Sequence, residues 1–287
     1  MKLLVTGAAG MLGFDVLRVG AAAGHELVAV DVDELDITNP GAVEAEFARV
    51  HPDAVLNCAA WTDVDGAESH REQAHAVNAD GARNLAMAAA WERVPLVHVS
   101  TDYVFSGEAF VDSSGAPRAY VESDPTGPRS AYGQTKLEGE REVLAASPRH
   151  TVARSSWLFG VRGHNFAATM LRLAGEREAV RVVSDQVGCP TWTGHLAPAL
   201  LGLLERGVSG LVHLAGAGHV SWNGFATEIF RQAELDCAVR EATTEQMPRP
   251  APRPAWSALE SERDDVIPLP PWQDGLAGYL AARAGIT

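Results

Sequence analysis

The sequence predicts an α/β protein: a doubly wound parallel sheet of the Rossmann type, with a smaller C-terminal substrate-binding region. Short apolar segments alternate with longer segments of helical spacing, as expected when parallel strands are buried on both faces and joined by helices. Glycines follow the first apolar segment, where a strand would turn into a helix. After about residue 157 the alternation loosens, so a second region is expected there.

The first half contains five predicted strands and four predicted helices. The strands are 2–5, 26–30, 54–57, 96–100 and 151–154, and the helices between them are 11–23, 40–50, 73–91 and 132–146. Pro40, which follows Thr38 and Asn39, is typical of a capped helix start.

The second half is less regular. It contains predicted helices at 165–174, 194–205, 221–233 and 272–284, predicted strands at 180–184 and 211–215, and a proline-rich loop at 247–254. We assign 1–158, with return segments at about 187–220, to a dinucleotide-binding domain. The substrate-binding region then comprises about 159–186 and 221–287.

The composition of the chain argues against two classes of binding partner. A net charge of −14 and a pI of about 5.1 argue against nucleic acid and anionic lipid. The first residues carry no signal-peptide pattern, and no apolar run is long enough to span a membrane, so we expect a cytoplasmic protein. The spacing of Cys58, Cys189 and Cys237 predicts reduced, mostly buried thiols rather than a disulfide framework or a zinc site.

The glycine turn indicates a phosphate-binding site. Gly7 permits a tight strand-to-helix turn, Gly10 lets the backbone approach a pyrophosphate, and Gly13 lets the helix pack closely on the sheet. The spacing is GxxGxxG, and its place between a strand and a helix favours dinucleotide binding over a turn without a ligand.

Acidic residues follow the second predicted strand. Asp31 is placed to bind the adenosine ribose hydroxyls, and Asp36 with Ile37 could reach the adenine. No basic residue occurs from 31 to 48, so a 2′-phosphate has no local partner. Residue chemistry alone therefore favours NADH or loose selectivity.

Tyr132 and Lys136 share one face of a predicted helix. A phenol is a poor proton donor at neutral pH until a nearby ammonium stabilises its phenolate, and Lys136 could supply that charge and bind the nicotinamide ribose. Tyr132 could then protonate a carbonyl oxygen as hydride arrives at carbon. Ser100 or Thr101, at the end of the fourth strand, could polarise the same carbonyl. A surface pair on a helix is the alternative for Tyr132 and Lys136.

These motifs resemble the extended short-chain dehydrogenase/reductase superfamily, and within it the dTDP-4-dehydrorhamnose reductase family. The similarity spans nearly the whole chain. Besides the glycine turn, Asn78-x-x-Gly81 and Tyr132-x-x-x-Lys136, the similar segments are 57–62 (NCAAWT), 100–105 (STDYVF), 132–140 (YGQTKLEGE), 154–160 (RSSWLFG), 165–174 (NFAATMLRLA), 185–191 (DQVGCPT) and 253–259 (RPAWSAL).

The resemblance implies NADPH-dependent reduction of the 4-keto group of dTDP-4-dehydrorhamnose (dTDP-4-dehydro-6-deoxy-L-mannose) to dTDP-L-rhamnose, or of a related nucleotide 4-ketosugar. NADH is accepted by some members. Tyr132 would be the proton donor and Lys136 would bind ribose, while Thr101, Asp102 and Trp157 would contact the sugar. The residues implied to line the cofactor are Gly10, Met11, Leu12, Asp31, Asp36, Ile37, Ala59, Ala60 and Thr62. Arg253 could bind the nucleotide diphosphate through its forked donors.

The sequence differs from many members of the family at positions that affect dimer formation and one polar contact near the site. Some relatives dimerise through magnesium held by Glu residues, and the matching positions here are Asp15 and Gly194. We therefore expect no metal, and a monomer or a homodimer without a bridging ion. Many relatives also carry Lys where this chain has Gly66.

Two other readings remain open. A sugar-nucleotide dehydratase or epimerase of the same superfamily is disfavoured because dehydratases carry Asp-Glu after the Ser/Thr, and here Tyr103 follows Asp102. A non-catalytic protein resembling the regulatory subunit of methionine adenosyltransferase is disfavoured because Tyr132, Lys136 and Thr101 are all present.

Overall fold

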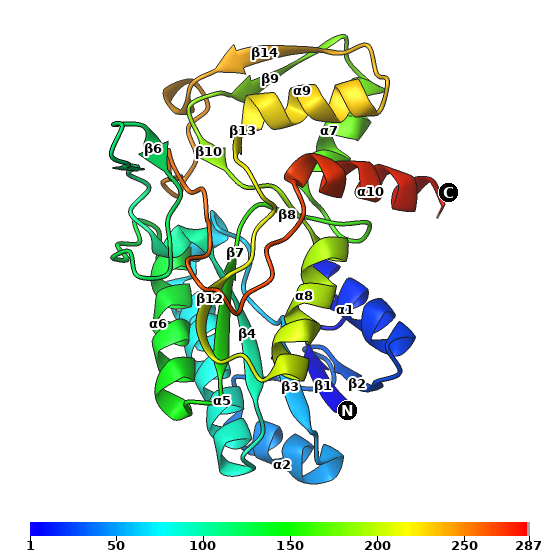
Figure 1. The fold of residues 1–287 in the computed structure, drawn as a ribbon, viewed down its shortest axis with the longest axis vertical. Coiled ribbons are helices and arrows are strands. Elements are labelled where there is room, and N and C mark those ends of the chain that lie inside the picture. Colours follow the sequence, from blue (N-terminus) through cyan, green and yellow to red (C-terminus); the bar gives the residue numbers. More distant parts are fainter. Residues whose placement is uncertain (286–287) are drawn as a thin grey trace.

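The computed structural model describes residues 1–285 and is built on one parallel sheet. Its six strands lie in the order β12-β7-β4-β3-β1-β2 (Figure 1). They are β1 (Lys2–Thr6), β2 (Glu26–Val30), β3 (Ala54–Asn57), β4 (Leu96–Thr101), β7 (Thr151–Ser155) and β12 (Gly210–His213). The predicted doubly wound fold is confirmed. Its chain order reverses between β1 and β3, and ligands bind in the crevice at such a reversal.

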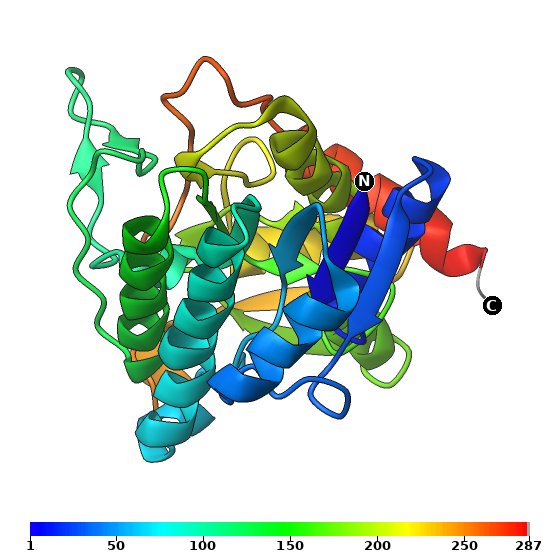
Figure 2. The same ribbon diagram turned by 90° about the horizontal axis from the view of Figure 1, so that it is seen from below.

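Helices cover both faces of the sheet (Figure 2). On one face lie α1 (Met11–Ala22) and α8 (Thr193–Arg206), and on the other lie α2 (Pro40–Val50), α5 (Ala82–Trp91) and α6 (Ala131–Ala146). Val5 and Leu56 point to the α1/α8 side, whereas Leu4 and Val55 point to the α2/α5 side. Successive residues of a strand therefore fill two separate cores, which explains why the strands are continuously apolar.

The predicted helix at 73–91 is interrupted. The structure has α3 (Gly66–Ser69), α4 (Arg71–His75), a π-helical turn η1 (Ala76–Gly81) and then α5. Asn78 in that turn is fully buried and binds both the backbone N–H and the carbonyl of Trp61, as well as the Thr135 hydroxyl. The wider turn thus ties the loop after β3 to α6, which a pattern of apolar spacing does not reveal.

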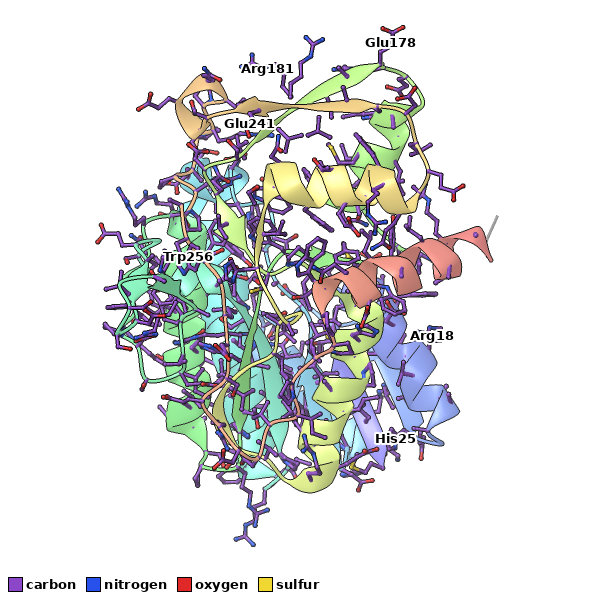
Figure 3. All side chains as sticks on the ribbon, turned by 45° about the horizontal axis from the view of Figure 1, so that its top comes forward. Arg18, His25, Glu178, Arg181, Glu241 and Trp256 are labelled. Atoms are coloured by element: carbon purple, nitrogen blue, oxygen red, sulfur yellow. The ribbon has the colours of Figure 1, made fainter. Side chains whose placement is uncertain are left out.

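A smaller region lies beyond the carboxyl ends of the sheet strands (Figure 1). It pairs β9 (Ala179–Val183) in parallel with β14 (Ala238–Ala242), and β14 was not predicted. The helices α7 (Phe166–Ala174), α9 (Trp222–Gln232) and α10 (Trp272–Ala284) share an aromatic core with this pair. Glu178 and Arg181 point outward at its far edge (Figure 3).

The remaining strands form short pairings. They are β8 (Leu158–Phe159) with β11 (Thr191–Trp192), β10 (Val187–Gly188) with β13 (Val220–Ser221), and a hairpin of β5 (Phe110–Val111) and β6 (Pro117–Arg118). The 3₁₀ turns are η2 (Asp102–Val104) and η3 (Thr244–Gln246). Val266 and Leu269 pack in the α1/α8 core, so part of the C-terminal segment returns to the sheet. The division into two regions remains our proposal. Among residues 1–285, no helix is long and apolar enough to cross a membrane.

Candidate active site

The glycine turn packs closely against the loop after β3 and leads into the uncapped start of α1. Gly7 has φ of +66°, and a Cβ there would lie 2.6 Å from the backbone nitrogen of Ala59. No side chain caps α1, whose N-cap is Gly10. The uncapped N–H groups and the positive end of the helix suit a phosphate. These features fit the pyrophosphate of a dinucleotide.

Asp31 lies against this turn. Its carboxylate accepts hydrogen bonds from the backbone N–H groups of Ala9 and Val32, both at 2.8 Å. Glu34 accepts the N–H of Asp31 at 2.9 Å. Two carboxylates thus stand where the adenosine ribose is expected, and both would repel a 2′-phosphate.

The other predicted cofactor residues are spread along the same crevice. Asp36 is exposed and binds the backbone and hydroxyl of Thr38, while Ile37 is buried against Gly81. Leu12 and Gly13 are buried, so Leu12 could offer a ligand only its backbone. The remaining four, which border the crevice at the start of α1 and after β3, are the half-buried Met11, Ala59 and Ala60 and the exposed Thr62.

The structure brings Tyr132 and Thr101 together at the carboxyl end of β4. The Ser130 hydroxyl accepts the Gly133 N–H and so fixes the start of α6. Burial raises the pKa of Tyr132 to about 12, although a hydrogen bond with the Thr101 hydroxyl lowers it. The Tyr103 ring packs edge-on against Tyr132, with centroids 5.6 Å apart. The phenol is therefore held in its protonated form beside a second hydroxyl.

Lys136 is buried with 1% of its surface exposed. Its Nζ lies 2.7 Å from the Val99 carbonyl and 3.1 Å from Nε2 of His98. Burial lowers the pKa of Lys136 to about 8, and the charge of Glu140 partly opposes this. In the free chain the amine is thus bound to β4. His98, a buried residue of β4, contacts it directly.

Asp102 is the second polar residue at this strand end. It is 2% exposed, and its Oδ1 accepts the Thr101 hydroxyl at 3.0 Å. Its Oδ2 is buried without a hydrogen-bond partner among residues 1–285. Burial raises the pKa of Asp102 to about 6, and the hydrogen bond from Thr101 opposes this only partly. An unpartnered buried carboxylate oxygen calls for a donor, and a sugar hydroxyl would supply one.

Trp157 has a partner that the sequence did not assign to the site. Its ring stacks on that of Trp222, at the start of α9, and Phe166 packs on Trp222 with centroids 4.5 Å apart. A Cβ at Gly188 would fall 2.5 Å from the Trp157 ring. The sequence offered one signal for Trp222, a tryptophan near the start of the predicted helix at 221–233.

Arg253 is placed across the loop after β3. Its guanidinium lies 3.0 Å from Asp65 and also bonds to the Ala251 carbonyl. The pKa of Asp65 is lowered overall. Burial would raise it, but hydrogen bonds from Ala251 and Arg253 outweigh that effect. A diphosphate would have to compete with this carboxylate for Arg253.

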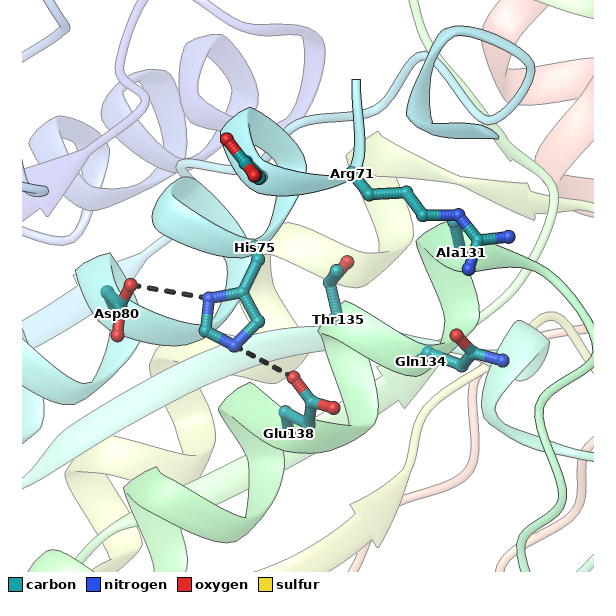
Figure 4. Close-up of a pocket in the computed structure, with 8 residues that line it drawn as sticks. Arg71, His75, Asp80, Ala131, Gln134, Thr135 and Glu138 are labelled. Atoms are coloured by element: carbon teal, nitrogen blue, oxygen red, sulfur yellow. Dashed lines mark ion pairs between the residues drawn. The ribbon is translucent and has the colours of Figure 1, made fainter. Parts of the chain in front are cut away.

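A surface cleft of 460 Å³ lies elsewhere and includes none of the predicted site residues. It is lined by Gln134, Glu138 and Thr135 of α6 together with the segment around α4, and His75 sits there between Asp80 and Glu138 (Figure 4). A second cavity of 320 Å³ lies under the segment from Ala258 to Leu269 and reaches Cys189 and His213.

Known proteins resemble this chain over its full length. The family model described as the RmlD substrate binding domain matches residues 1–284. The dTDP-4-dehydrorhamnose reductase of Mycobacterium tuberculosis (strain ATCC 25618 / H37Rv) is 45% identical over 293 residues, which cover 100% of this chain and 94% of the relative. The chain belongs to this reductase family. The resemblance seen in the sequence is thus confirmed.

Two further members show the range of the family. A Streptomyces antibioticus protein, a probable dTDP-4,6-dihydroxy-2-methyloxan-3-one 4-ketoreductase, is 43% identical, with 96% of this chain and 93% of that protein covered. The crystal structure of the Bacillus anthracis dTDP-4-dehydrorhamnose reductase in complex with NADP is 34% identical, with 98% and 100% covered, and superposes with a TM-score of 0.93.

Proposed function

We propose that the protein reduces the C4 ketone of dTDP-4-dehydrorhamnose with NADPH and so forms dTDP-L-rhamnose, or that it acts likewise on a closely related nucleotide 4-ketosugar. The observation that carries this proposal is the placement of the Tyr132 phenol near the Thr101 hydroxyl at the carboxyl end of β4, on the same edge of the sheet as the glycine turn after β1. Membership in a family of reductases of this chemistry supports it.

Each site residue has a distinct task in this reaction. When bound, NADPH supplies the hydride that adds to sugar C4. Tyr132 gives its proton to the ketone oxygen, which becomes the hydroxyl of the product. The Thr101 hydroxyl, which donates to Asp102 in the free protein, turns to donate to the same oxygen. Because burial holds the phenol protonated, Tyr132 carries the proton throughout the neutral range.

The substrate is held by polar and aromatic groups around this centre. Asp102 accepts a sugar hydroxyl at its unpartnered Oδ2. The paired indoles of Trp157 and Trp222 offer an apolar wall for the C–H face of the sugar. Arg253 reaches the diphosphate after exchanging Asp65 for it, as a forked donor can.

The cofactor is NADPH, and we propose that NADH is also accepted. A relative of known structure is described in complex with NADP. In this chain, however, Asp31 and Glu34 crowd the ribose end, and the first basic residue after β2 is Arg49. Weak discrimination between the two cofactors follows from that arrangement.

Assembly and location remain predictions. The Asp15 carboxylate, at one of the two positions where some relatives hold magnesium, is buried and bonded to Thr193 and Arg18. We propose a monomer or a homodimer without a bridging ion, working in the cytoplasm.

The test is NADPH oxidation with a dTDP-4-keto-6-deoxyhexose and the 3,5-epimerase that prepares the substrate. We expect one NADPH consumed per product in the wild type, and a loss of kcat of about 100-fold or more in Tyr132→Phe. Tyr279→Phe, which removes a phenol bonded to Arg283 in α10, is the matched control. Turnover without net NADPH consumption would instead indicate a dehydratase or an epimerase.

A further inference from the structure

A chain of buried polar groups runs from Lys136 back into the sheet. Nζ of Lys136 lies 3.1 Å from His98 Nε2, and His98 Nδ1 lies 2.9 Å from Nδ2 of Asn57. His98 in β4 is 0% exposed, and Asn57 in β3 is 1% exposed. At the far end, the Thr6 hydroxyl donates to Asn57 Oδ1 at 2.8 Å.

A backbone N–H group fixes the direction of donation along this row of hydrogen bonds. The N–H of Ala59 can only donate, and it donates to Asn57 Oδ1 at 3.0 Å. The amide nitrogen of Asn57 therefore faces His98 and donates to Nδ1. A neutral imidazole then carries its one hydrogen on Nε2, which points at Lys136.

This tautomer of His98 affects which protonation state of Lys136 is favoured. A neutral amine can accept the Nε2–H of His98 and donate to the Val99 carbonyl, so every group in the chain is satisfied. An ammonium has no lone pair, so it would leave two donors facing one another at one of the two imidazole nitrogens. A donor left unsatisfied in a buried site is costly.

We propose that His98 is a positioning residue for the reduction, which, together with Asn57, favours the neutral amine of Lys136 and so keeps this lysine ready to exchange a proton. The pairing rests on the geometry of the free chain, and its meaning for catalysis rests on the proposed function. Once Tyr132 has given its proton to the ketone oxygen, a proton from solvent restores the phenol before the next turnover. The neutral amine of Lys136 is the state that the His98 Nε2–H stabilises.

The charge of Glu140, one turn along α6, acts in the opposite direction. Burial lowers the pKa of Lys136 to about 8, and Glu140 raises it only partly. Glu140 is itself paired with Arg154 at 2.7 Å. Burial and Lys136 hold the pKa of His98 well below its usual value, so the imidazole stays neutral.

The pKa of Lys136 can be measured directly because the protein contains two lysines, Lys2 and Lys136. Protein labelled with ¹³C at the lysine ε-carbon gives two signals, and Lys2→Arg assigns them. In the free wild-type chain we expect Lys136 to titrate near pH 8. In His98→Phe we expect its pKa to rise above that of the wild type, while burial still holds it below the ordinary lysine value of about 10.4.

His150→Phe is the matched control. His150 is also 0% exposed, and its Nε2 bonds to the Ala86 carbonyl, so this variant disturbs a buried histidine without touching Lys136. It should change stability and leave the Lys136 titration as it is.

The tautomer of His98 can be measured in the wild-type protein, and it tests the proposal without a substitution. With ¹⁵N-labelled histidine, and at a pH above the Lys136 pKa, we expect the hydrogen on Nε2. An Nδ1–H tautomer, an ordinary lysine pKa in the wild type, or an unchanged Lys136 pKa in His98→Phe would each overturn the proposal. Because all these measurements use the free chain, such a result would leave the proposed reductase activity untouched.

Discussion

The indole of Trp157 lies flat on that of Trp222, with ring centroids 3.5 Å apart and 4° between the ring planes. Trp157 also has φ of +48°, a strained conformation for a bulky residue. Stacking on Trp222 offsets that strain and orients the ring. One indole therefore sets the position of the other at the proposed sugar site.

Substituting Trp222→Leu removes this support. We expect KM for the sugar nucleotide to rise by about 3- to 10-fold, since such aromatic pairs contribute about 0.5–1.5 kcal/mol. The value of kcat should change little because the hydroxyls that act on the ketone are untouched. Trp91→Leu, on the exposed surface of α5, is the control. A fall in kcat at constant KM would contradict this role for Trp222.

Gly7→Ala tests the glycine turn. The new Cβ would meet the Ala59 backbone at 2.6 Å, and the residue would still need a positive φ, so the loop must move. We expect NADPH affinity, measured by fluorescence titration, to fall by about tenfold or more. Gly24→Ala shares the positive φ but has open space around it. It should cost about 1–2 kcal/mol of stability and leave NADPH binding intact. Equal effects of the two substitutions on binding would show that the turn does not approach the cofactor.

Asp102 makes stability depend on pH. Its folded pKa of about 6 lies above the usual value of 3.8, so the folded chain binds the proton more tightly than the unfolded chain. This contribution is fully present below about pH 4 and is lost as the pH rises through about 6. Relative to the wild type, Asp102→Asn should therefore gain about 2–3 kcal/mol between pH 4 and pH 7, measured by urea unfolding. A constant difference across that range would mean that the carboxyl titrates normally.

The buried pair of Glu140 and Arg154 is expected to be fragile. Both side chains are nearly inaccessible, at 2% and 4% exposed, and they form two hydrogen bonds. Glu140→Gln leaves an uncompensated guanidinium and should cost about 3–5 kcal/mol in urea unfolding. The exposed pair of Arg172 and Glu176 is the comparison, and Glu176→Gln should cost less than about 0.5 kcal/mol. Similar costs for both would show that burial of the first pair is unimportant.

The fold and the helical placement of Tyr132 and Lys136 were predictable because each depends on local pattern. Apolar runs between helices of regular spacing fix the parallel sheet, and Tyr132 with Lys136 lie one helical turn apart in any register. The π-helical turn around Asn78 was missed because its cause is a set of bonds to Trp61 and Thr135, which are distant in sequence. The strand β14 was missed because its residues are largely exposed and become a strand only beside β9.

Contacts between distant segments account for the rest of the site. The sequence places His98 in a buried strand but cannot show that Lys136 turns toward it. In the same way, Arg253 was expected to be free for a diphosphate, whereas the fold brings Asp65 to it. Such pairings arise only when strands and loops far apart in the chain meet at one edge of the sheet.

Transfer of deuterium is the most direct test of the proposed reduction. The wild-type protein, given NADPH deuterated at the transferable position and the dTDP-4-keto-6-deoxyhexose with its epimerase, should yield a product with one deuterium at C4. In Tyr132→Phe the same product should form more slowly by a factor of about 100 or more. Unlabelled product at C4, or full activity without the Tyr132 hydroxyl, would contradict the account.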